Sequence, residues 1–243
     1  MKTVLGCVRR ADEDFHMIEA GDRIAVGVSG GKDSLLLLHA MALYRKFCKQ
    51  PFELFAITLT MGIGEFDEDS VRALCDELDV PYIVKHTDIL DVVINQRKEK
   101  NPCALCAKMR RGALGDLCAE HNFNKIALGH HADDAIETLM LSLFYEGRIH
   151  TFHPVTYLSR SNLTQIRPMV YLPESYIKVM QQKLNLPVVK SPCPANGYTK
   201  REEMKNMLDD LNKRIPHVRD LMLTALRNDK RYGLWEKDKI DGR

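Results

Sequence analysis

Short apolar runs alternate along most of the chain with longer segments in which apolar residues recur at helical spacing. Five runs predict buried strands, at residues 24–28, 52–59, 81–85, 125–129 and 165–169. The segments between and after them predict helices, at 35–47, 68–78, 109–121, from 132 onward and at 173–184. Beyond residue 187 the strand signals stop, and two more helices are predicted at 200–213 and 216–228. Strands that alternate with helices indicate a parallel sheet with right-handed crossovers.

This alternation indicates an α/β fold with an open, mostly parallel sheet of five strands and helices on both faces. A chain of 243 residues is long enough for one sizeable domain of this kind, whereas two full domains would be cramped. We therefore expect one domain over 1–243. It would comprise an N-terminal helix within 1–19, an α/β core at about 20–190 and a helical tail at 195–243.

Composition says more about the location of the protein than about its partners. The net charge of +2 and the isoelectric point near 8.1 exclude neither nucleic acid nor a small substrate, because a balanced total can hide a local basic face. No apolar run is long enough to span a bilayer, and the N-terminal residues turn polar too early for a secretory signal. We expect a cytoplasmic protein with no membrane partner.

A glycine-rich loop joins the first predicted strand to the helix after it, with the sequence Ser29-Gly30-Gly31-Lys32-Asp33-Ser34. Paired glycines let backbone N–H groups approach anionic oxygens, the helix start adds the positive end of its dipole, and Lys32 supplies a point charge. The loop predicts a phosphate site that is not a Walker A motif, with an ordinary glycine-rich turn as the alternative. It resembles the pyrophosphate loop of the PP-loop ATPases, which cleave ATP between the α and β phosphates and adenylate an oxygen of their substrate.

A second polar element follows the fourth predicted strand and reads Gly129-His130-His131-Ala132-Asp133-Asp134-Ala135-Ile136-Glu137-Thr138. It falls at the carboxyl edge of the predicted sheet, where ligands of open parallel sheets bind. One explanation of the acidic pair is capping of the helix N-terminus. The other is chemical, since carboxylates beside a triphosphate need a cation between them, which suggests Mg²⁺ held by Asp33 and Asp134. Asp133 would instead help to activate the base, although the sequence does not divide these roles.

Seven cysteines in a chain without an export signal argue against a disulfide framework and favour metal or thiol chemistry. Cys103 and Cys106 form a C-x-x-C motif, and Cys193 lies far along the chain. A structural zinc site requires a fourth ligand, for which Cys118, inside a predicted helix, and His121, near its end, are poor candidates. A [4Fe-4S] cluster on three cysteines would leave one iron open to sulfide, and a redox dithiol is the third alternative. The remaining cysteines, at or near predicted helices, are interpreted as buried fillers: Cys7, Cys48, Cys75 and Cys118.

Five motifs together resemble the tRNA 2-thiocytidine synthetases, the cytidine-thiolating branch of the PP-loop enzymes: S-G-G-K-D-S, P-C-A-L-C-A-K-M-R-R-G, G-H-H-A-D-D-A-I-E-T, L-F-Y-E-G and a late P-C. The resemblance spans roughly residues 20 to 195. It implies a PP-loop (HUP), Rossmann-like fold in which Cys103, Cys106 and Cys193 hold a [4Fe-4S] cluster. Relatives that thiolate uridine usually carry zinc-binding cysteine pairs at their ends, and the lack of such pairs here favours the cytidine branch.

The resemblance also implies a substrate and a reaction. The substrate is tRNA, thiolated at C2 of the cytidine at position 32 of the anticodon loop, with ATP, Mg²⁺ and the cluster as cofactors. Residues 29–34 with Gly129 and His130 would bind the nucleotide, whereas Lys32, Asp133, Asp134 and the three cysteines would take part in catalysis. Sulfur would come from a partner such as a cysteine desulfurase or from sulfide, and a homodimer is expected because relatives are often dimers.

Two other functions stay open at this point. One is a PP-loop enzyme with another nucleophile, which modifies tRNA or forms an amide and has no need of three cysteines. The other is a non-catalytic nucleotide-binding or redox module built on the same sheet. Release of pyrophosphate in the presence of ATP and RNA would separate an enzyme from such a module.

The clearest basic patch carries six cations against one acid, Glu99, and consists of Arg97, Lys98, Lys100, Lys108, Arg110 and Arg111. Such cations would neutralise RNA phosphates and hold an anticodon loop over the cysteine site, where a splayed base can be reached. A solvated helix face is the alternative.

Overall fold

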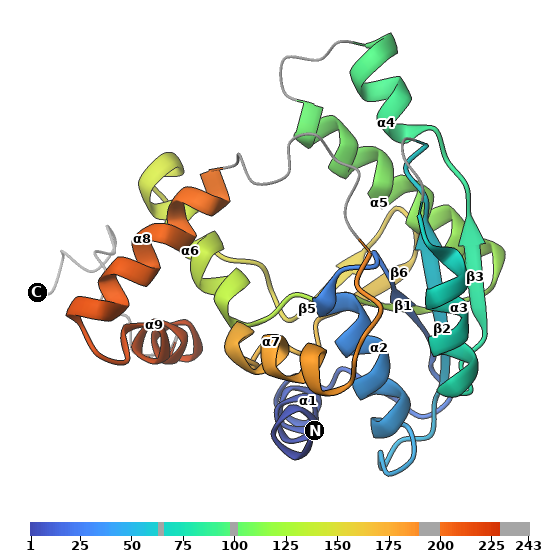
Figure 1. The fold of residues 1–243 in the computed structure, drawn as a ribbon, viewed down its shortest axis with the longest axis horizontal. Coiled ribbons are helices and arrows are strands. Elements are labelled where there is room, and N and C mark those ends of the chain that lie inside the picture. Colours follow the sequence, from blue (N-terminus) through green and yellow to red (C-terminus); the bar gives the residue numbers. More distant parts are fainter. Residues whose placement is uncertain (63–65, 98–101, 190–199, 229–243) are drawn as a thin grey trace, which may run out of the picture. The chain divides into compact units, whose positions relative to one another are not determined.

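A six-stranded sheet with the strand order β3-β2-β1-β4-β6-β5 organises the computed structural model (Figure 1). The structure describes residues 1–62, 66–97, 102–189 and 200–228. Parallel pairing joins β1 (Arg23–Gly27), β2 (Glu53–Leu59), β3 (Tyr82–Lys85), β4 (Lys125–Ala127) and β6 (Leu163–Ile166). The edge strand β5 (Val155–Leu158) pairs antiparallel with β6.

The helices of the described residues are α1 (Lys2–Phe15), α2 (Lys32–Tyr44), α3 (Glu68–Glu77), α4 (Ile89–Asp91), α5 (Pro102–Glu120), α6 (Ala132–Glu146), α7 (Glu174–Lys183), α8 (Lys200–Arg214) and α9 (Val218–Arg227). A π-helical turn, η1 (Val92–Gln96), continues α4.

The two faces of the sheet carry different apolar clusters. Ile24 and Val26 of β1 belong to a large cluster with side chains of α1, α2, α3 and α7, whereas Ala25 belongs to a smaller cluster with side chains of α5. This assignment follows from the two-residue side-chain period of a strand. Helices therefore cover both faces, as the sequence predicts, with α5 packed opposite α2.

The strand order places a topological switch point between β1 and β4. From β1 the chain crosses to β2 and β3 on one side, while β4, β6 and β5 lie on the other side. The loops that follow β1 and β4 therefore diverge at the carboxyl edge and leave a crevice where open α/β sheets bind ligands. These loops are the two polar elements found in the sequence.

The predicted fold class is confirmed, with two local corrections. The sheet has six strands rather than five, because the predicted set omits β5. In addition, α5 begins at Pro102 rather than at 109. Proline suits the first position of a helix, where no intrahelical partner for its missing N–H is needed. The C-x-x-C motif therefore lies inside a helix and not ahead of one.

The described residues separate into two compact units. The larger unit contains the sheet and comprises residues 1–134 together with the described part of 152–199. In the smaller unit, Ile136 and Met140 of α6 pack with Met204 and Leu208 of α8 in an apolar cluster. A single domain over 1–243 stays a prediction. No helix among the described residues is long and apolar enough to cross a membrane.

Candidate active site

The side chain of Ser34 closes the loop after β1. Its hydroxyl accepts a hydrogen bond from Ser29 N at 3.1 Å and donates one to the Gly31 carbonyl at 3.0 Å. The chain can turn this tightly because Gly30 adopts a φ of +77°, and a Cβ there would lie 2.9 Å from two neighbouring side chains. Ser34 is therefore an internal brace of the loop.

The first turn of α2 is open to an anion. Gly31 is the N-cap residue, and it makes no side-chain hydrogen bond to the helix. The first N–H groups of a helix have no intrahelical acceptor, so an uncapped N-terminus offers donors and a positive dipole end to a phosphate. This arrangement supports the phosphate site predicted from the sequence.

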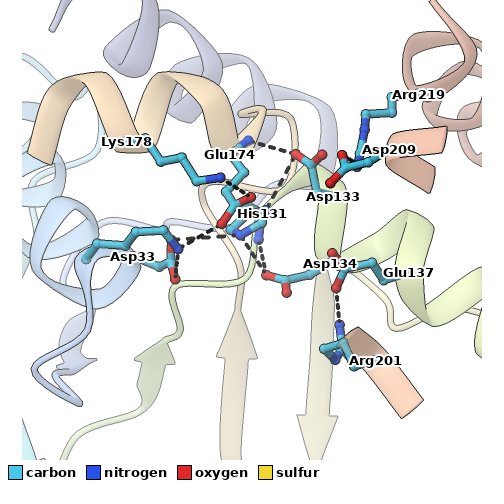
Figure 2. Close-up of polar contacts among 11 residues, drawn as sticks. Asp33, His131, Asp133, Asp134, Glu137, Glu174, Lys178, Arg201, Asp209 and Arg219 are labelled. Atoms are coloured by element: carbon cyan, nitrogen blue, oxygen red, sulfur yellow. Dashed lines mark hydrogen bonds and ion pairs between the residues drawn. The ribbon is translucent and has the colours of Figure 1, made fainter. Parts of the chain in front are cut away.

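Lys32 lies between two carboxylates. Its Nζ is 2.9 Å from Asp33 Oδ1 and 3.1 Å from Glu174 Oε1, and Glu174 also pairs with Lys178 at 3.1 Å (Figure 2). Partial burial lowers the pKa of Lys32, but the charges and hydrogen bonds of Asp33 and Glu174 outweigh it, so the pKa lies above its usual value. Lys32 is thus held as a cation beside the loop.

Gly129 brings the second polar element against the first. A Cβ at this position would lie 3.0 Å from the carbonyl carbon of Asp33 and 3.0 Å from Ser34 N, which real Cβ atoms rarely allow. The missing side chain therefore lets the loop after β4 touch the start of α2. As a result, His130 and His131 lie next to the phosphate loop.

His131 lies among three carboxylates (Figure 2). Its ring is buried, with Nε2 at 3.4 Å from Asp134 and 3.8 Å from Asp33, and with Nδ1 at 3.8 Å from Asp133. The backbone N–H of His131 also donates to Asp134 Oδ2 at 2.9 Å. The polar residues of the two loops and the first turn of α6 thus form one cluster at the carboxyl edge.

The two aspartates of this cluster have different environments. Asp133 is buried, and its Oδ2 accepts a 2.7 Å hydrogen bond from Glu174 N at the first residue of α7. Asp133 thereby caps α7 and not its own helix, α6. The capping explanation is therefore correct about the interaction but wrong about the helix. Asp134 is more exposed and shares the Nε2 side of His131 with Asp33.

Asp33 and Asp134 fit a magnesium ion that arrives with its nucleotide. Both approach the same ring nitrogen of His131, so their carboxylates converge. Within the described ranges, no group of three or more potential ligands is arranged to hold a metal ion. Magnesium usually binds through one or two carboxylates together with substrate phosphates and water, so a pair of carboxylates is what this chemistry requires.

The described cysteines differ in burial. The prediction of buried fillers is confirmed for Cys75 and Cys118, whereas Cys7 and Cys48 are only half-buried against the large apolar cluster. Burial raises the pKa of Cys118 to about 12, and burial with a contribution from Asp76 does the same for Cys75, so both stay protonated at neutral pH. Cys106 is half-buried near the start of α5. Cys118 lies twelve positions after Cys106 on the same helix, about 18 Å along its axis, so it cannot share a metal with it.

The other members of the three-cysteine set are only partly described. Cys103 is one helical turn before Cys106 in α5. Cys193 lies outside the described residues, as do Lys98 and Lys100 of the basic patch. The described members of that patch are all exposed, and none forms a salt bridge with a described residue: Arg97, Lys108, Arg110 and Arg111. Unpaired exposed cations on α5 and just after η1 suit RNA phosphates.

Glu174 is a site residue that the sequence analysis does not identify. It follows Pro173 at a predicted helix start, where an acidic residue is ordinary, so no local signal distinguishes it. Its contacts to Lys32 and, through its backbone, to Asp133 depend on how α7 packs against α2 and the loop after β4.

Comparison with known proteins gives this geometry a family. A model described as the PP-loop domain matches residues 7–210. The tRNA-cytidine(32) 2-sulfurtransferase of Pelobacter propionicus is 39% identical over 224 residues, which cover 91% of this chain and 83% of that protein. The protein of the same name from Geobacter metallireducens is 38% identical over 224 residues, covering 91% of this chain and 87% of its own.

A solved structure is similar as well. The U34-tRNA thiolase NcsA from Methanococcus maripaludis, described with its [4Fe-4S] cluster, has a TM-score of 0.74 and 26% sequence identity. The match covers 91% of this chain and 76% of that one. On its phosphate loop, its sheet and these relatives, the chain belongs to the PP-loop family and, within it, to the tRNA-cytidine(32) 2-sulfurtransferases.

Proposed function

We propose that this protein uses ATP to convert a cytidine of tRNA, at position 32 of the anticodon loop, to 2-thiocytidine. The observation that carries the proposal is the single polar cluster formed by the phosphate loop, His131 and the carboxylates. This cluster lies at the switch point of the sheet. A relative of this chain is named tRNA-cytidine(32) 2-sulfurtransferase. Exposed cations of α5 supply a surface for RNA.

The proposed first step is adenylation. The C2 oxygen of cytosine attacks the α-phosphorus of ATP, an O–P bond forms, and pyrophosphate leaves. Lys32 and the open N-terminus of α2 bind the phosphates and stabilise the charge that moves onto the leaving group. Asp33 and Asp134 would hold Mg²⁺, which would neutralise phosphate charge when bound.

The proposed second step is sulfur transfer. A sulfide-level sulfur attacks C2, the C2–O bond breaks, and AMP leaves with the former base oxygen, so no net oxidation or reduction occurs. Adenylation is required because an unactivated carbonyl oxygen is a poor leaving group, whereas AMP carries its charge on a phosphate. Free sulfide would supply this sulfur directly, whereas a cysteine desulfurase delivers it as a persulfide, which external thiols would first reduce to sulfide while they form a disulfide.

Cys106, with Cys103 and Cys193, would hold a [4Fe-4S] cluster whose fourth iron binds sulfide when the cluster is present. Cys106 is half-buried in the second turn of α5, so its sulfur is not enclosed in an apolar cluster. Cys75 and Cys118 do not fit this role, because both are buried inside apolar clusters of the larger unit. The proposal includes a homodimer, and its only support is the resemblance to the tRNA 2-thiocytidine synthetases.

The decisive test of the reaction is the modification itself. tRNA from cells that lack the protein should lose 2-thiocytidine and keep its thiouridines, as measured by mass spectrometry of nucleosides. In vitro, ATP should yield AMP and pyrophosphate, and Lys32→Ala should remove most turnover, with exposed Lys46→Ala as the matched control. An ADP product, or unchanged thiocytidine in the cells, would reject the proposal.

The metal has its own test. Protein purified without oxygen should be brown and contain roughly four irons per chain, with the spectrum of a cubane cluster. Cys106→Ala should lose both iron and thiolation, whereas Cys48→Ala, at another half-buried thiol, should lose neither. One zinc per chain with full activity would instead favour a persulfide carried on cysteine.

A further inference from the structure

A pocket of about 280 Å³ lies between α5 and the half of the sheet formed by β4, β6 and β5. Its apolar lining includes Leu128, Leu158 and Leu163, and Arg110 and Arg111 of α5 line it as well. Because both arginines are exposed, the pocket reaches the surface. It therefore combines an apolar floor with cationic walls.

Arg167 gives this pocket a buried charge. The residue lines the pocket and is only 7% exposed. Its Nη1 donates to the His153 carbonyl and, at 3.2 Å, to Thr156 Oγ1, whereas its buried Nε has no hydrogen-bond partner. No carboxylate of the described residues forms a salt bridge with it. Burial lowers the pKa of Arg167 to about 10, so the guanidinium is still charged at neutral pH.

A buried cation with no counter-charge is unfavourable unless something else compensates it. Both side-chain hydrogen bonds of Arg167 go to neutral oxygens, and the Phe152 ring beside the guanidinium is neutral too, so no negative charge balances Arg167. Two more arginines line the same pocket and also lack a carboxylate partner among the described residues. Three cations around one cavity make it a site for an anion.

The pocket adjoins the proposed reaction site. The Phe152 ring lies 4.8 Å from the Arg167 guanidinium and 5.1 Å from the ring of His130, so one aromatic side chain links the two residues. His130 also lines the pocket and directly follows Gly129, which touches the phosphate loop. A ligand in the pocket would therefore lie beside the nucleotide that reacts with ATP.

We propose that this pocket binds one nucleotide of the RNA substrate, with its phosphate at Arg167 and its base on the leucine floor. The proposal rests on the proposed function. Single-stranded RNA offers this combination of an anionic backbone and an apolar base face, and proteins bind it with cations beside apolar or aromatic surfaces. The Gln165 side chain lines the pocket and can donate to and accept from a base edge.

The test is the affinity of the full-length protein for an anticodon stem-loop RNA that contains the target cytidine, measured by fluorescence anisotropy over a range of salt. Arg167→Met should weaken binding by about tenfold or more and reduce the slope of log K against log salt by about one. The matched control is Arg160→Met, which removes an exposed arginine from the β5–β6 turn and should change affinity much less.

A second variant is needed in case Arg167→Met loses RNA binding because it misfolds. Ala107 is exposed on α5 and lines the pocket, so Ala107→Trp should fill it while Arg167 and the core residues are left unchanged in sequence. It should weaken RNA binding by a similar factor, with an unchanged melting temperature and unchanged affinity for ATP. RNA affinity that stays at the wild-type value in Ala107→Trp, or a loss of ATP affinity in place of RNA affinity, would overturn the pocket proposal.

The same samples distinguish this inference from the proposed function. If wild-type protein forms 2-thiocytidine while both pocket variants bind RNA normally, the function stands and the pocket assignment falls. If the pocket variants lose RNA binding but wild-type protein forms no 2-thiocytidine, the pocket assignment stands and the reaction assignment falls.

Discussion

Lys32 and Glu174 form an ion pair that we expect bound ATP to rearrange. The lysine has two carboxylate partners, Asp33 and Glu174, and Glu174 lies close to where the phosphates would bind. We expect Glu174→Gln to lower the Kd for ATP about three- to fivefold, because one negative charge near the triphosphate is removed while Asp33 still holds Lys32. Isothermal titration with a non-hydrolysable ATP analogue measures this.

The Glu174→Gln substitution leaves the backbone N–H of residue 174 in place. The hydrogen bond from this N–H to Asp133 therefore remains, and the start of α7 should not change. Glu120→Gln, at an exposed carboxylate of α5, is the matched control and should leave the Kd for ATP unchanged. A higher Kd in Glu174→Gln would mean that this carboxylate orients Lys32 for the phosphates instead of competing with them.

Gly129 is the residue on which the contact between the two loops depends. A methyl group there meets backbone atoms of Asp33 and Ser34 at 3.0 Å, and backbone cannot move aside as a flexible side chain can. We expect Gly129→Ala to weaken ATP binding by about tenfold, because it displaces the start of α2 from His131 and Asp134. Gly6→Ala in α1, with nothing within 4 Å of the new methyl group, should bind ATP normally.

Some residues of the candidate site are recognisable from the sequence and others are not. The phosphate loop and the Asp133-Asp134 pair are contiguous strings, so their chemistry is visible locally. Glu174 and Arg167 act through contacts with residues distant in sequence, and their own neighbours give no signal. Asp133 illustrates the intermediate case, because its capping chemistry is predictable but the helix that it caps is not.

At the scale of elements, α2 is the central helix of the larger unit. Its four consecutive leucines are fully buried, and α2 contacts both α1 and α7. A helix that is apolar on all sides must be surrounded by other elements. We expect Leu36→Ala to lower the free energy of unfolding by about 2–5 kcal/mol in urea titrations. Val179→Ala on α7, at a side chain 47% exposed, should cost far less.

Most elements were predictable because their patterns are local. The strands β1 to β4 and the helix α3 follow directly from apolar runs and periodicity. The edge strand β5 escaped prediction since none of its residues is buried, so it has no strong apolar pattern and is defined by pairing with β6. The first turns of α5 were missed because residues 102–107 hold a proline and the C-x-x-C motif and show no clear helical spacing of apolar residues.

At the scale of the whole molecule, buried thiols should make stability depend on alkaline pH. Cys75 and Cys118 have a pKa of about 12 in the folded protein, against 9.0 for an exposed thiol, mainly because burial disfavours the thiolate. Between these values the folded state keeps protons that the unfolded state releases. The free energy of unfolding is therefore undiminished below pH 9 and falls as the pH rises toward 12, because the folded state binds more protons.

We expect each thiol to lower the free energy of unfolding by up to about 1.4 kcal/mol per pH unit in that range. Urea titrations under reducing conditions at pH 8 and pH 10.5 measure the difference. Cys118→Val replaces the thiol by an apolar side chain that cannot ionise, so it should make the stability less dependent on pH even if the variant is less stable at pH 8. Val179→Ala, at an exposed side chain of α7 that does not ionise, should leave the dependence as in the wild type. If Cys118→Val showed the same pH dependence as the wild type, the folded core would have to accommodate the thiolate of Cys118. Burial would then no longer distinguish Cys118 from the proposed cluster ligands.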